Sequence, residues 1–167
     1  MTTPPLQTAR LDLEAVHPSH AQEAWPLLDD DRMWSYFPEI RPASRDDLRR
    51  LYQKWERGSP SPAEIWHNWM CRERAGGALA GNMQSTVLPA QRAAYIAYAI
   101  YPRFQHQGYA REACLAIIAF VRETYAVERI WAEMDVRNEA SFRLAESMGF
   151  TRVTERDGEY RYELAFQ

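Results

Sequence analysis

One junction constrains the fold of this chain more than any other feature: an apolar run leads through a short polar turn into an amphipathic helix. Residues 94–101, Ala-Tyr-Ile-Ala-Tyr-Ala-Ile-Tyr, are apolar at odd and even positions alike, which is typical of a strand covered on both faces. After Gly108, apolar residues return at steps of three and four, which indicates a helix with one buried face. A strand joined to a helix in this way predicts an α/β domain.

The segments on either side of this junction complete the expected order of elements. The patterns predict strands at residues 10–16, 65–72, 79–88 and 129–136, and a closing hairpin of 150–154 and 160–166 around Asp157-Gly158. Helices are expected after Ser19, after the N-cap Ser44, and from residue 138 to 148. We therefore expect a mixed α/β sheet within a single domain that spans residues 1–167.

The turn at the junction, Gln105-His106-Gln107-Gly108-Tyr109-Ala110, has the chemistry of an anion site. A glycine lets the backbone approach a ligand closely, and the small Ala110 leaves room beside it. The first N–H groups of a helix have no partner within the helix, and its dipole favours negative charge there. The pattern suits a pyrophosphate, but it also suits a plain strand-to-helix turn, so a second signal is needed.

That second signal is the helix expected at residues 138–148. It begins with Asn138-Glu139-Ala140-Ser141 and ends with Met148-Gly149-Phe150. Asn138 is a good N-cap, and Gly149 suits a left-handed C-cap with Phe150 packing back on the helix. Helix capping alone explains these residues, so the argument for a function depends on the order and spacing of both signals.

The two signals occur in one order along the chain: a central strand, Q-x-x-G-x-A, a helix, a further strand, N-E-A-S and a helix ending in M-G-F. This order resembles that of the general N-acetyltransferase (GNAT) superfamily. The stretches G-Y-A-x-E-A and N-E-A-S are most similar to its Rim-type branch, which includes enzymes that acetylate protein N-termini. The resemblance covers residues 94–166. It implies a mixed, largely antiparallel sheet with a splayed parallel strand pair and flanking helices. It also implies transfer of an acetyl group from acetyl-coenzyme A to a primary amine by direct attack.

The resemblance implies a set of cofactor-binding residues. The pantetheine arm of acetyl-CoA would pair with the backbone of Tyr98, Ala99 and Ile100, where the two parallel strands splay apart. The pyrophosphate would rest on the turn and the helix start, at Gln105, His106, Gln107, Gly108, Tyr109, Ala110 and Arg111. Asn138 would hydrogen-bond the pantetheine or an ordered water.

The implied catalytic residues are Asn138 and Ser141, with the Ser141 hydroxyl donating a proton to the departing thiolate. Two positions depart from the family pattern. Ala145 stands where many relatives carry a tyrosine acid, and Tyr95 stands where many Rim-like relatives carry a glutamate base. The base therefore stays open among Glu64, His67, Glu133 and Asp135, each acting through water.

Composition excludes several classes of function. A net charge of −3 and a pI of about 5.8 argue against a nucleic-acid-binding protein. The chain has no apolar run near the roughly 20 residues that span a bilayer, and its first residues lack a signal pattern, so we expect a cytoplasmic protein without a membrane partner. No metal is expected, because His17 and His20 have no third ligand at suitable spacing.

The amine acceptor stays open between a small molecule and a peptide N-terminus. Asp29, Asp30 and Asp31 lie beside Trp34, Tyr36 and Phe37, a combination that suits a cationic amine and equally suits a solvated helix end with packed aromatics. The departures at Tyr95 and Ala145 also keep an alternative function in view, a catalytically silent acyl-CoA sensor or scaffold of the same fold. A monomer and a homodimer are both compatible with the sequence.

Overall fold

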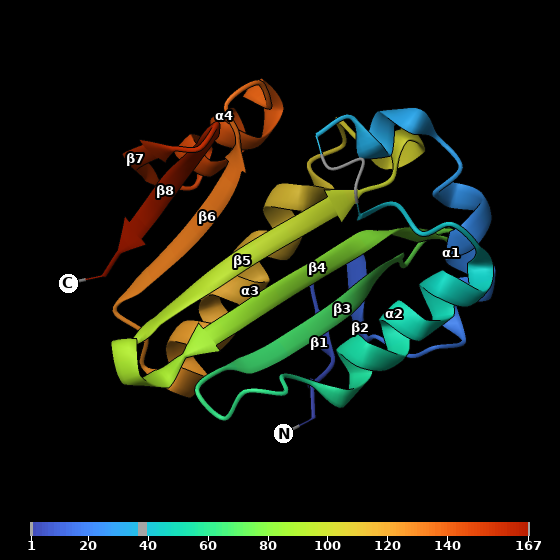
Figure 1. Cartoon of the computed structure of the whole chain (residues 1–167), viewed down its shortest axis with the longest axis horizontal. Helices are drawn as coiled ribbons and strands as arrows, with labels where there is room; N and C mark the ends of the chain where they lie inside the picture. The colour runs from blue at the N-terminus through green and yellow to red at the C-terminus, as the bar shows by residue number, and fades with distance from the viewer. Residues whose placement is uncertain (1, 37–39, 167) are drawn as a thin grey trace.

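The computed structural model describes residues 2–36 and 40–166, which form one eight-stranded sheet with helices on both faces (Figure 1). The strands lie in the order β1-β2-β3-β4-β5-β6-β8-β7. Their bounds are β1 Leu6–Gln7, β2 Leu11–Ala15, β3 Ile65–Glu73, β4 Leu79–Leu88, β5 Ala93–Ile100, β6 Arg129–Asp135, β7 Thr151–Arg156 and β8 Glu159–Ala165. All neighbouring strands are antiparallel except β5 and β6. The expected mixed, largely antiparallel α/β sheet is confirmed.

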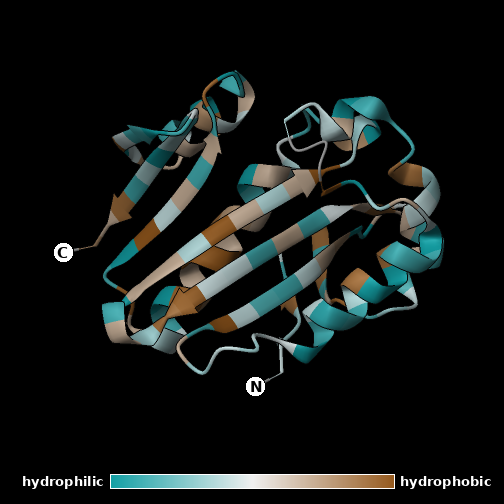
Figure 2. Cartoon of the chain, viewed as in Figure 1, coloured by the Kyte–Doolittle hydropathy of each residue, from teal (hydrophilic) through white to brown (hydrophobic). Residues whose placement is uncertain are grey.

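Four α-helices pack against this sheet in the described residues: α1 His20–Ala24, α2 Arg45–Arg57, α3 Tyr109–Tyr125 and α4 Glu139–Ser147. In Figure 1, α2 lies on the near face of the sheet and α3 on the far face. Buried residues of α3, such as Ile117, form a core with β6 Ile130 and the other far-face positions of the strands. Figure 2 shows α2 as mostly hydrophilic, and it buries only Leu48 and Tyr52. In the part of the chain that is described, none of the helices is long and apolar enough to cross a membrane.

Local capping interactions begin and end the helices where the sequence predicts. The Ser44 hydroxyl accepts a hydrogen bond from the Asp47 amide at 3.1 Å, which caps α2. At the end of α4, Gly149 has a φ of 91°, and the Phe150 amide donates to the Ala145 carbonyl at 3.1 Å. This arrangement is a Schellman motif, which a glycine favours. The helix expected after Ser19 is shorter than predicted, because a 3-10 turn at Trp25–Leu27 replaces its second half at Pro26.

The parallel strands β5 and β6 pair over only three residues each. Ala93, Ala94 and Tyr95 face Arg129, Ile130 and Trp131, and beyond these pairs the two strands diverge into a V, as Figure 1 shows. Over its whole length β6 instead pairs with β8, so residues 129–165 form a C-terminal wing of β6, α4, β7 and β8. The sequence predicts a central strand covered on both faces, but Ala97 of β5 is exposed, because the near face is open beside the V.

Gly81 of β4 allows β5 to approach closely at its far end. A Cβ added at Gly81 would lie 2.2 Å from the Ala99 carbonyl oxygen and 2.9 Å from the Ile100 Cα, and both of these are backbone atoms. Neither atom can move without bending the end of β5, so only glycine fits this position.

We predict that Gly81→Ala destabilises the protein by about 1–3 kcal/mol, the usual cost of forcing atoms into a packed interior. Urea unfolding would measure the free energy of unfolding. Gly76→Ala is the matched control, because its Cβ would meet only the flexible carboxylate end of Glu73. Equal stabilities of the two variants would contradict the close approach of β4 and β5.

Candidate functional site

The turn that follows β5 places a helix start at the open end of the V. Gly108 is the N-cap of α3 with a φ of 80°, and His106 is exposed with a φ of 60°. The Gln105 side chain donates to the Ile100 carbonyl at 2.9 Å, which ties the turn to the end of β5. The unpaired N–H groups of the first helical turn therefore lie next to the diverging strands.

The side chains of three predicted cofactor residues already have hydrogen-bond partners within the protein. The Tyr109 hydroxyl donates to Glu73 on β3, and Arg111 reaches the Ser147 carbonyl of α4 at 3.5 Å. The Gln107 side chain donates to the Arg103 carbonyl at 3.1 Å. What these positions offer a ligand at the turn is therefore their backbone, together with the small side chain of Ala110.

Arg10 supports the turn from behind and was not predicted from the sequence. Its guanidinium donates to the Gln107 carbonyl at 2.9 Å and to Glu112 at 2.7 Å, and lies 4.6 Å from the centre of the Tyr109 ring. The Thr8 hydroxyl and the Arg10 amide also donate to Glu112. Partial burial would raise the pKa of Glu112, but these hydrogen bonds lower it below its ordinary value. This Arg10–Glu112 brace fixes the turn to the segment that connects β1 and β2.

The start of α4 forms the other side of the V. Asn138 caps the helix, its side-chain oxygen accepting from the Ser141 amide at 3.2 Å. Within the described chain, the Asn138 amide nitrogen and the Ser141 hydroxyl make no hydrogen bond and are available to a ligand. The Tyr98 hydroxyl donates to the Ser141 carbonyl at 3.5 Å, and burial raises its pKa to about 12, so it stays protonated. Two hydroxyls and one amide thus lie at the first turn of α4.

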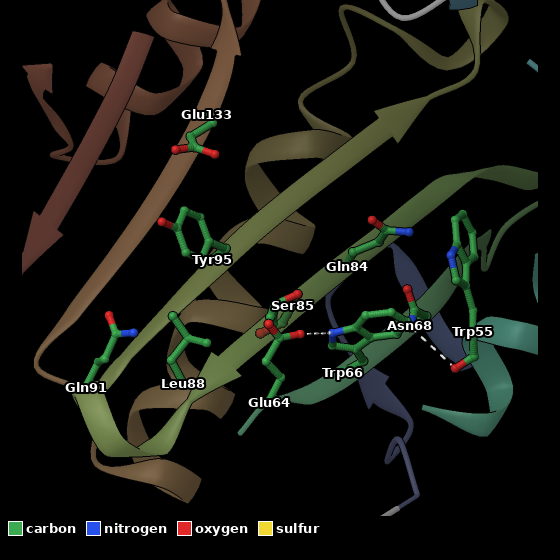
Figure 3. A pocket seen from close by; sticks show the side chains of 11 residues that line it. Trp55, Glu64, Trp66, Asn68, Gln84, Ser85, Leu88, Gln91, Tyr95 and Glu133 are labelled. Carbon is green, nitrogen blue, oxygen red and sulfur yellow. Dashed lines mark hydrogen bonds between the residues drawn. The ribbon is translucent and has the colours of Figure 1, made fainter. Parts of the chain in front are cut away.

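A groove of about 520 Å³ lies on the near face of the sheet, beside the closed end of the V. We call it the near-face groove. It is lined by Trp55 of α2 together with Glu64, Trp66, Asn68, Gln84, Ser85, Thr86, Leu88, Gln91, Tyr95 and Glu133. Figure 3 shows the Tyr95 ring extending toward β6 and Glu133, and the Glu64 carboxylate beside the Trp66 indole. The Trp66 indole N–H donates to Glu64 at 2.8 Å.

The structure separates the four candidate bases. His67 is fully buried, hydrogen-bonded to Tyr125 at 2.6 Å, and burial lowers its pKa to about 4. Hydrogen bonds from Arg137 lower the pKa of Asp135 to about 2, which makes it a poor base. Only Glu64 and Glu133 line the groove, and Glu133 is paired with Arg161 at 2.6 Å.

Neighbouring arginines neutralise the charges of Asp29, Asp30 and Asp31, the acidic segment that the sequence offers for amine recognition. Asp30 binds Arg32 at 2.6 Å, and Arg41 binds Asp31 at 2.6 Å and Asp29 at 3.3 Å. The Trp34 indole donates to the Leu28 carbonyl at 2.9 Å, and Phe37 lies outside the described residues. Tyr36 lies 5.8 Å from the Arg137 guanidinium near the start of α4. These contacts favour the structural interpretation of the segment.

The residues missed by the sequence interpretation belong to two groups. Trp55, Trp66 and Gln84 of the groove lie on separate elements, and no local motif connects them. The pairing of Arg10 with Glu112 spans most of the chain, and each residue alone looks like an ordinary surface charge. Within residues 2–36 and 40–166, no cluster of three or more histidine, cysteine, aspartate or glutamate side chains could hold a metal.

Comparison with known proteins identifies this architecture. A model of the acetyltransferase (GNAT) domain matches residues 10–151, so the chain belongs to the GNAT acetyltransferase family. No curated protein sequence matches it.

Solved structures share the fold. A GNAT-family acetyltransferase from Bacillus anthracis aligns with a TM-score of 0.82 and 19% identity over 97% of this chain and 98% of that chain. RimL, a ribosomal L7/L12 alpha-N-protein acetyltransferase in complex with coenzyme A, aligns with a TM-score of 0.78 and 21% identity. The alignment covers 99% of this chain and 98% of that chain. An acetyl transferase from Salmonella typhimurium that modifies the N-terminal serine of ribosomal protein L7/L12 aligns with a TM-score of 0.77 and 19% identity. The alignment covers 96% of this chain and 97% of that chain.

We predict that Arg10→Met loosens the turn between β5 and α3, because it removes the hydrogen bond to Gln107 and the ion pair with Glu112. Hydrogen–deuterium exchange should then rise in peptides that cover residues 104–112 and stay unchanged in β3 and β4. Arg49→Met is the control, because the one ion pair that Arg49 makes with described residues is an exposed pair with Asp46 within α2. Unchanged exchange in the turn would contradict the brace.

Proposed function

We propose that this protein is an N-acetyltransferase that moves an acetyl group from acetyl-CoA to a primary amine, with the 167 residues acting as one domain. The observation that carries the proposal is the V between β5 and β6, which has the glycine-capped start of α3 at its open end. An unpaired strand edge beside a helix N-terminus suits a ligand that has both an amide chain and a pyrophosphate. The RimL complex with coenzyme A shares this fold.

The residues of the V fit acetyl-CoA, which supplies the activated acyl group when it is bound. The backbone of β5 at Tyr98, Ala99 and Ile100, where β6 no longer pairs, would hold the pantetheine amides, although the Ile100 carbonyl already accepts from Gln105. The N–H groups after Gly108 would hold the pyrophosphate, and the Asn138 amide would donate to the pantetheine. The Arg10–Glu112 brace would keep the turn in its binding geometry.

In the reaction, the amine nitrogen bonds to the acetyl carbon, the carbon–sulfur bond breaks, and the thiolate receives a proton. Backbone N–H groups of β5 would stabilise the oxyanion. Ser141 would donate its hydroxyl proton to the leaving thiolate and would take up, through water, the second proton that the attacking nitrogen loses on forming the amide. Glu64 or Glu133 would accept, through water, the proton that the ammonium loses. The other two candidates are unsuitable, because His67 lies on the far face and Asp135 is ion-paired with Arg137. The amine would enter from the near-face groove.

The first test is release of free coenzyme A thiol from acetyl-CoA when a panel of primary amines is added. We expect release with wild type, and loss of at least about tenfold in acetyl-CoA affinity for Gly108→Val. A side chain at a positive φ strains the turn by about 1–3 kcal/mol, and its Cβ would lie 3.3 Å from the Arg10 guanidinium. Circular dichroism would check that the variant folds. Unchanged affinity in calorimetry would place the cofactor elsewhere.

The alternative, a catalytically silent acyl-CoA sensor, gives a different result in the same experiment. It predicts that acetyl-CoA binds and that no amine in the panel releases thiol. The alternative rests on Tyr95 and Ala145, which replace the glutamate and tyrosine of many relatives.

Ser141→Ala should lower kcat by about 10²-fold, the low end for a positioned proton donor. Acetyl-CoA affinity should change little, because the contact matters mainly as the thiolate departs. Ser147→Ala is the matched control on the same helix, where the hydroxyl donates to the Leu144 carbonyl and to no other described residue. An unchanged kcat for Ser141→Ala would leave the role to the nearby Tyr98 hydroxyl, which Tyr98→Phe would then reveal.

A further inference from the structure

The near-face groove ends in a row of aromatic residues at the closed end of the V. Trp66 of β3 is in register with Thr86 of β4, Thr86 with Tyr95 of β5, and Tyr95 with Trp131 of β6. The pair Tyr95–Trp131 is also the last pair before the strands diverge. A molecule on this row therefore lies beside the point where the acyl group would arrive, so the following inference rests on the proposed function.

The walls of the groove combine flat apolar surface with one uncompensated carboxylate. Trp55, Trp66 and Tyr95 supply three rings, and the described residues that line the groove include no lysine or arginine. Glu133 is neutralised by Arg161, whereas Glu64 accepts only the Trp66 indole N–H and has no ion pair in residues 2–36 and 40–166. The groove thus favours positive charge near Glu64.

The Lys54 ammonium lies over one of these aromatic rings, that of Trp66. The ammonium of Lys54, on α2, lies 5.8 Å from the centre of the Trp66 ring, within the range of a cation–π contact. Arg161 lies at a similar distance, 5.7 Å, from the Tyr95 ring, outside the groove lining. The rings are therefore placed to bind cations, and Lys54 is a competitor for an incoming ammonium at Trp66.

We infer that the acceptor is an arylalkyl ammonium: a primary amine a few bonds from a flat apolar ring, with no carboxylate beside it. The ring would stack on Trp66 and Tyr95, and the ammonium would lie near Glu64 on its way to the V. A carboxylate next to the amine would face Glu64 and be repelled. A volume of about 520 Å³ is sufficient for such a molecule.

The test compares amines that differ in one feature each. Thiol release would be followed with phenethylamine, with propylamine, which lacks the ring, with L-phenylalanine, which adds a carboxylate, and with L-phenylalaninamide. A peptide that begins with phenylalanine separates a peptide source of this chemistry from a small molecule. We expect kcat/KM for phenethylamine and the amide to exceed that for propylamine and L-phenylalanine by at least about tenfold, as expected for burying a ring. Equal values for phenethylamine and propylamine, or a preference for L-phenylalanine, would overturn the inference.

Three variants locate the preference in the groove. Trp66→Leu should reduce the advantage of phenethylamine over propylamine to less than about threefold, since the stacking surface is lost. Glu64→Gln should raise the KM for phenethylamine and improve the relative use of L-phenylalanine. Lys54→Met should lower the KM for phenethylamine because it removes the competing ammonium, an improvement that a purely structural role for Trp66 does not produce. Glu123→Gln, on the exposed face of α3, is the charge control.

A binding measurement separates this inference from the proposed function. Calorimetry with phenethylamine and saturating coenzyme A requires no turnover, and the difference in tryptophan fluorescence between wild type and Trp66→Leu isolates the signal of Trp66 from the other five tryptophans. Binding that Trp66→Leu weakens, without thiol release from any amine, would support the groove and reject the transferase. Thiol release with propylamine alone, without binding of phenethylamine, would support the transferase and reject the groove.

Discussion

Three backbone pairs between β5 and β6 determine the form of the whole site. They join the C-terminal wing to the rest of the sheet at Ala93–Tyr95, and they end where the chain needs an opening. The wing keeps its own structure because β6 pairs with β8 along its full length. A strand edge inside a sheet would normally be costly, since unpaired backbone groups need partners. Here the stretch of β5 that β6 does not pair with is the proposed site for the pantetheine arm.

The two ends of the V have different chemistry, and each is supported by contacts made far from it in the sequence. At the open end, the Arg10–Glu112 brace holds a turn whose backbone favours anions. At the closed end, aromatic rings and Glu64 favour cations. The opposed preferences suit the proposed transfer of an acetyl group from a pyrophosphate-bearing cofactor to an amine, because each reactant is attracted to its own end of the V.

Much of the fold is readable from the sequence because it depends on local signals. Ser44, Asn138 and Gly149 cap their helices as expected, and Asp157 and Gly158, both at positive φ, form the hairpin turn between β7 and β8. These predictions rest on backbone conformations that few residues adopt. The length of the β5–β6 pairing has no such signal, since strand pairing depends on contacts between distant segments.

The candidate site is only partly readable for the same reason. The sequence predicts the turn at Gly108 and the start of α4, which carry motifs, and it leaves the base open among four residues. Burial of His67 and the arginine beside Asp135 make these two residues poor bases and leave Glu64 and Glu133 as candidates. Neither effect can be predicted from the sequence alone. The acidic residues 29–31 suggest an amine site until Arg41, ten residues or more away, is found to neutralise two of them.

Because β5 and β6 pair at three positions each, the width of the V can change without loss of hydrogen bonds between the strands. Beyond Tyr95, the wing is held at the mouth by long side-chain contacts, from Tyr98 to the Ser141 carbonyl and from Arg111 to the Ser147 carbonyl, both at 3.5 Å. Substitutions at these two positions would widen or narrow the opening while every strand pair stays intact. A protein with this fold can therefore change the width of this opening through Tyr98 and Arg111 without losing the strand pairs that stabilise the sheet.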